Sequence, residues 1–207
     1  MANLTDLIPL VRERVHNCPD PVIEQALRWA ARDFSRETHI WTVNANFTLN
    51  AGSSSLSYSF TSPGDTDIVA WRMLLLDDGA IPITILDRPE WPRVRSDSTP
   101  KYAYFEDVNT ITFDAEPAEN ISIRYEIAIM NARGSNVVND TFMNSWGDAL
   151  AAGARYKLLT QPDRYWSDLN AAQMDMSEYR QGIMNAKQHI HKGFGTTPKR
   201  VLQNRFI

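Results

Sequence analysis

The spacing of apolar residues changes twice along this chain, and these changes limit the folds it can adopt. Up to about residue 39, apolar side chains recur every three or four residues, as on one face of a helix. From Trp41 to Leu49 they alternate with polar residues, which is the period of a strand. The helical period returns after residue 139. A sheet is therefore expected to interrupt a helical set that both ends of the chain supply.

Capping residues and prolines divide the helical parts. They predict four helices, over about residues 5–17, 20–39, 139–159 and 162–192. In the last of these, apolar residues recur by alternating steps of four and three, a seam that can pack against a neighbouring helix. Four residues of this seam are candidates for a contact between subunits: Leu169, Met176, Tyr179 and Ile183.

The middle of the chain predicts an antiparallel sheet. Hairpins are expected over 41–60, 68–85 and 101–113, with a further strand over 121–129, and Pro82 places its strand at an edge. The fold class is therefore α+β. We expect a four-helix bundle from residues 1–39 and 139–195, an inserted β domain over 40–130, and an extended C-terminal arm over 196–207.

The charges are distributed unevenly. The chain has 25 acidic and 21 basic residues, a net charge of −4. After Glu178 there are six basic residues and no acidic one, so residues 1–178 carry 15 − 25 = −10. The arm combines three cations with large apolar residues, and such a segment is expected to dock on a protein surface. Its candidate docking residues are Lys199, Arg200, Val201, Leu202, Arg205, Phe206 and Ile207.

Motifs for catalysis or ligand binding are missing from the sequence. It contains no Gly-x-Ser-x-Gly elbow and no glycine-rich phosphate loop. His189 and His191 are two residues apart on a predicted helix and point in different directions, and Cys18 has only His16 nearby as a base. We therefore expect no enzyme activity, no cofactor and no metal site.

Several separated motifs, in this order, resemble one protein family. They are Ala26–Phe34 (ALRWAARDF) followed by Trp41, then Trp146–Ala154 (WGDALAAGA), Tyr165–Asp168 (YWSD) and Gly193–Gly195 (GFG). Together they resemble the head-to-tail adaptor, or connector, proteins of tailed phages, with the tail tubular A proteins of short-tailed phages as looser relatives. The similarity covers the helical parts, roughly half of the chain.

The resemblance implies a structural virion protein at the head–tail junction, made in the host cytoplasm. Such a protein forms a ring of about twelve subunits under the portal protein, and DNA passes through the ring without specific binding. The arm is then expected to bind the portal, and Trp91, in a loop with several arginines, to contact a downstream tail or nozzle protein. A nucleic-acid-binding accessory protein is the alternative, although the acidic body argues against it.

Overall fold

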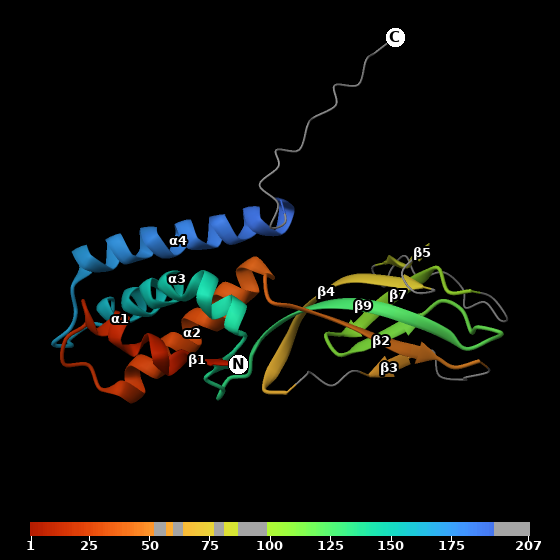
Figure 1. Cartoon of the computed structure of the whole chain (residues 1–207), viewed down its shortest axis with the longest axis horizontal. Coiled ribbons are helices and arrows are strands. Elements are labelled where there is room, and N and C mark those ends of the chain that lie inside the picture. Colours follow the sequence, from red (N-terminus) through yellow and green to blue (C-terminus); the bar gives the residue numbers. More distant parts are fainter. Residues whose placement is uncertain (52–56, 60–63, 77–80, 87–98, 193–207) are drawn as a thin grey trace, which may run out of the picture.

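The computed structural model describes residues 1–51, 57–59, 64–76, 81–86 and 99–192. It is an α+β structure, with the helices gathered at one end and the long strands at the other (Figure 1). The helices are η1 (Leu4–Leu7), α1 (Ile8–Arg12), α2 (Asp20–Thr38), α3 (Asp140–Leu159) and α4 (Leu169–Lys192). The strands are β1 (Ala2–Asn3), β2 (Thr42–Leu49), β3 (Ser57–Ser59), β4 (Thr66–Leu76), β5 (Ile81–Pro82), β6 (Thr84–Ile85), β7 (Tyr102–Asp107), β8 (Thr110–Phe113), β9 (Ile121–Asn131) and β10 (Val137–Val138).

The expected four-helix bundle is wrong. The helix predicted over residues 5–17 is instead a 3-10 turn followed by the five-residue α1, so three long helices make up this end of the molecule. Pro9 lies in the first turn of α1, where proline is tolerated because the amides of the first turn have no partner within the helix. Asn17 then adopts a left-handed backbone, with φ of 59°, before α2 begins.

Helix α4 begins later than predicted. Asp163, expected in its first turn, has a left-handed backbone with φ of 57°, which a helix cannot accommodate. The cap is Asp168, whose Oδ1 accepts hydrogen bonds from the amides of Asn170 at 2.9 Å and Ala171 at 3.1 Å. Tyr165 therefore lies in the connecting loop and is fully exposed. Helix α3 begins where the sequence predicts, near residue 139, and Asn139 caps it by accepting a hydrogen bond from the amide of Thr141.

The strands form two four-stranded sheets, in the orders β2-β9-β4-β5 and β3-β8-β7-β6, and β1 pairs with β10. The hairpin β7–β8 is confirmed, and Pro82 lies on an edge strand as predicted. The hairpin predicted over 68–85 is confirmed only as far as Pro82, because Thr84 and Ile85 form β6 and pair with β7 in the other sheet. The hairpin expected over 41–60 is wrong, because β2 pairs with β9 and β3 pairs with β8. Leu49, Leu74 and Ile123 from one sheet share a core with Ile111 and Phe113 from the other.

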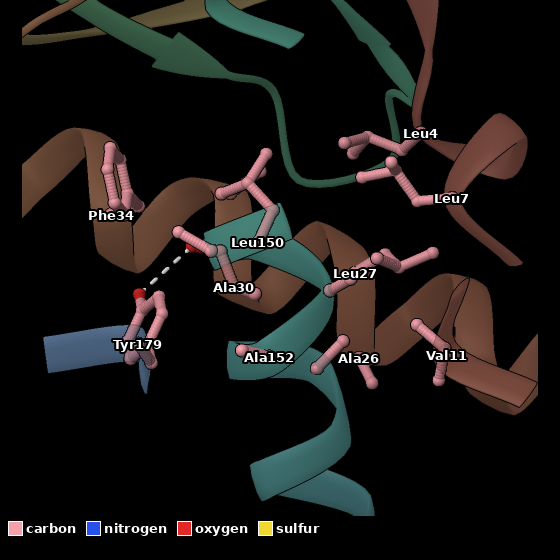
Figure 2. Packing of buried hydrophobic residues seen from close by; sticks show 14 of the residues in the cluster. Leu4, Leu7, Val11, Ala26, Leu27, Ala30, Phe34, Leu150, Ala152 and Tyr179 are labelled. Atoms are coloured by element: carbon pink, nitrogen blue, oxygen red, sulfur yellow. Dashed lines mark hydrogen bonds between the residues drawn. The ribbon is translucent and has the colours of Figure 1, made fainter. Parts of the chain in front are cut away.

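A second core fills the helical end and continues into the base of the sheet. Figure 2 shows Phe34 of α2 and Leu150 of α3 within it. The ring of Phe34 lies 5.7 Å from that of Trp146 and 6.1 Å from that of Tyr179. Ile127 and Ile129 of β9 belong to the same core. The β insertion is therefore packed against the helices through continuous apolar contacts.

Polar contacts also brace the two parts of the molecule. Arg32 of α2 donates a hydrogen bond to Asp67 Oδ2 of β4 at 2.9 Å and another to the carbonyl oxygen of Asn131 in β9. Trp41, between α2 and β2, stacks on Phe142 of α3 with ring centroids 5.8 Å apart. These contacts fix the direction in which the sheet leaves the helices.

Candidate subunit interface on helix α4

Helix α4 lies along α3 on the outside of the helical end (Figure 1). Two glycines allow the close approach. A Cβ at Gly182 would lie 2.5 Å from Ala149 Cβ, and a Cβ at Gly153 would lie 2.7 Å from the ring of Tyr179. Because nothing larger than hydrogen fits at these positions, α4 sits at a fixed depth against α3.

Buried charges hold the same helix in place. The carboxylate of Asp175, which is 0% exposed, accepts hydrogen bonds from Arg155 Nε at 2.8 Å and from Arg14 Nη1 at 2.7 Å. Arg155 of α3 is 7% exposed and also donates to Glu178 at 3.1 Å and to the carbonyl oxygen of Leu10 at 3.2 Å. One network thus joins α4 to α3 and to the chain around α1.

Tyr179, one of the predicted interface residues, lies inside the chain. Its hydroxyl is 2.9 Å from Asp33 Oδ2 and 3.2 Å from the carbonyl oxygen of Ala30, the contact drawn in Figure 2. Burial, followed by the negative charge of Asp33, raises the pKa of this phenol above its ordinary value. Ile183 also packs against the helical core. Both residues therefore serve to attach α4 to its own chain.

Leu169 and Met176 lie on a different flank of α4. They line a groove of about 640 Å³ between this flank and the end of α3. Leu169 is 69% exposed and Met184, farther along the same groove, is 52% exposed. Tyr156 of α3 forms part of the opposite wall, and Arg180 supplies a positive charge. Exposed apolar side chains that line a continuous groove are typical of protein–protein contact sites.

The sequence seam identified only part of this groove. Met184 and Arg180 were missed because they lie beside the seam that contains Tyr179. Residues 169, 173, 176, 180 and 184 are spaced by three or four positions and so form a second row along one flank of the helix. This spacing is the sequence pattern that could have predicted the groove residues of α4. Tyr156 belongs to another helix, so only the packing of α3 against α4 brings it to the groove.

A smaller hollow of about 220 Å³ lies where the helices meet the sheet. Trp41, Phe142, Trp146 and His189 line it, and the ring of His189 stands edge-on to Trp146 with centroids 6.0 Å apart. Within the described ranges, no three His, Cys, Asp or Glu side chains are grouped so that they could hold a metal ion. His191 belongs to α4, and its side chain is not among those that the structure describes.

Cys18 is buried, and burial, followed by the nearby carboxylate of Asp20, raises the pKa of its thiol. A raised pKa lowers the thiolate fraction and so lowers nucleophilicity at neutral pH.

Two predicted contact regions lie outside the described residues. One is Trp91, the candidate contact with a tail protein. The other is the arm of 196–207, with Lys199, Arg200, Val201, Leu202, Arg205, Phe206 and Ile207. Their roles stay predictions from the sequence.

Comparison with known proteins adds no relative. The chain matches no protein-family model, and no curated protein matches its sequence significantly. Over the residues that are described, no helix combines the length and the apolar character needed to span a membrane.

Proposed function

We propose that the chain is a structural adaptor of a tailed phage that forms a ring under the portal protein and joins the capsid to the tail. The observation that carries the proposal is the groove on α4, which has a mixed polar and apolar lining with Leu169, Met176 and Met184 along one flank, Leu169 and Met184 being exposed. A surface of this kind, on a helix that is packed closely and rigidly against α3, suits contact with the next subunit of a ring.

Contacts around a rotation axis are heterologous, so the groove of one subunit would receive a different surface of its neighbour. The order of the sequence motifs supports the same function. The acidic body, with a net charge of −10 over residues 1–178 (15 − 25), suits a channel in which DNA must slide, because repulsion keeps contacts with phosphates weak.

The ring contact can be tested by mixing the protein with the portal protein of the same phage and imaging the particles by negative-stain electron microscopy. The proposal expects rings for the natural chain and none for Leu169→Asp or Met184→Asp, since each variant places a charge in the groove. Met174→Asp is the matched control, because Met174 is 68% exposed on α4 but does not line the groove. Rings formed by all three variants would argue against the groove.

The arm is tested separately. Deletion of residues 196–207 is expected to leave a folded protein that no longer captures the portal in a pull-down, because the apolar residues of the arm supply the buried area. Undiminished capture by the truncated chain would refute a portal-docking arm.

Binding to DNA discriminates the alternative function. An adaptor is expected to bind duplex DNA negligibly at physiological salt, because few phosphates are neutralised. Tight, salt-dependent binding would favour a nucleic-acid-binding accessory protein.

A further inference from the structure

Strand β2 is an edge of its sheet, next to β9 (Figure 1). The amide of Ile129 donates to the carbonyl oxygen of Trp41 at 2.8 Å, and the register continues without interruption to Leu49. In an antiparallel pair, alternate residues bond to the partner strand, so the odd-numbered residues of β2 bond to β9. The even-numbered residues, 42 to 48, direct their amide and carbonyl groups away from the sheet. Within the described part of the chain, these outward groups have no partner.

The other described edges are protected in ways that β2 is not. Strand β5 has two residues and includes Pro82, β6 has two residues, and β3 has three. Strand β4, beyond its short pairing with β5, is interrupted by two bulges. Short strands, proline and bulges all hinder the addition of another strand. Strand β2 has eight residues, no charge, no proline, no glycine and no bulge, so it is open to strand addition.

The sequence of β2 shows which strand would fit. The even-numbered residues of β2, whose backbone groups point away from the sheet, are arranged symmetrically about Ala45. Asn44 and Asn46 lie on either side of Ala45, and Thr42 and Thr48 lie beyond them. A second β2, placed antiparallel on a twofold axis through Ala45, would set each threonine opposite a threonine and each asparagine opposite an asparagine. Like pairs of these residues can hydrogen-bond across strands. Asn44, Asn46 and Thr48 are exposed.

We propose that two copies of this chain associate through β2, forming a twofold antiparallel pair that joins their sheets. Each outward residue exchanges two backbone hydrogen bonds with its counterpart, Asn44 with Asn46 of the second copy and Thr42 with Thr48. The antiparallel arrangement places the helical ends of the two copies at opposite ends of the joined sheet, because β2 runs from the helices toward the far end of the strands (Figure 1). This twofold contact is distinct from the heterologous ring contact and does not depend on the proposed function.

Light scattering coupled to size-exclusion chromatography, over a dilution series of the full chain, tests the association. The natural chain is expected to approach twice its mass of 23.6 kDa as its concentration rises. The double variant Asn44→Lys, Asn46→Lys places two lysines opposite each other at both 44–46 pairs of the dimer. It is expected to weaken association by about tenfold or more. Asn44→Lys with Asn46→Asp is the matched control, because the twofold register then pairs each lysine with an aspartate, and it should associate at least as well as the natural chain.

Cysteine cross-linking gives a second measurement that does not rely on charge. In this register the Cα atoms of residue 44 and residue 46 of the second copy lie about 5.5 Å apart, within reach of a disulfide, whereas two residues 44 are about 7–8 Å apart. A mixture of the single variants Asn44→Cys and Asn46→Cys should therefore form mixed cross-links on mild oxidation in preference to cross-links of either variant alone. The proposal is overturned by any one of three results. The natural chain stays monomeric at about 100 µM, the lysine–aspartate control associates no better than the double lysine variant, or residue pairs 44–46, 44–44 and 46–46 cross-link equally.

Discussion

Replacement of Asp175 by asparagine tests the charge network that fixes α4. The substitution keeps the size of the side chain but removes a negative charge that is 0% exposed and bonded to two arginines. Arg155, 7% exposed, is then left with Glu178 as its carboxylate partner. Removing one partner of a buried ion pair typically lowers the free energy of unfolding by about 3–5 kcal/mol. Since domains are stable by about 5–15 kcal/mol, this would be a large fraction of the total.

Two controls separate burial from charge. Arg14 is 46% exposed, so Arg14→Gln is expected to lower the free energy of unfolding by less than about 1 kcal/mol. The double variant Arg155→Met with Asp175→Leu removes both buried charges and fills the space with apolar atoms. It should be more stable than Asp175→Asn alone, because it leaves neither charge unpaired.

The assay is urea unfolding followed by circular dichroism and tryptophan fluorescence, with free energies from linear extrapolation. The reasoning is refuted if Asp175→Asn loses less than about 1 kcal/mol of unfolding free energy, or if the double variant is no more stable than Asp175→Asn.

Two further predictions concern the packing of α4. Because the folded protein holds the pKa of Tyr179 above its usual value, this residue stabilises the fold below about pH 10, and the contribution is lost as pH rises further. Urea unfolding across this range should show a smaller loss for Tyr179→Phe than for the natural chain; equal losses would contradict this. Gly182→Ala should destabilise by about 1 kcal/mol, since overpacking against Ala149 outweighs the gain in helix propensity. A higher urea midpoint for this variant would contradict this, because it would mean that α3 and α4 move apart enough to accommodate the added methyl group.

The proposed interface was only partly accessible to sequence analysis. The periodic seam pointed to α4 and included Leu169 and Met176, which line the groove. The same seam included Tyr179, which the packing against α2 and α3 buries within the chain. A period of three to four residues marks a face of a helix, but the buried or exposed state of that face depends on the neighbouring helices.

The sequence by itself determined the elements whose signals are local. Asn139 caps α3, and the turn between β7 and β8 joins neighbouring strands, because the atoms involved lie within a few residues of one another. Tertiary structure decided the pairing of β2 with β9, whose residues are about 80 positions away along the chain. It also decided that Asp168 would cap α4, since the carbonyl oxygen of Leu159 holds the Asp168 amide there at 3.1 Å. Both outcomes depend on which apolar faces are buried together, and that is a property of the assembled core.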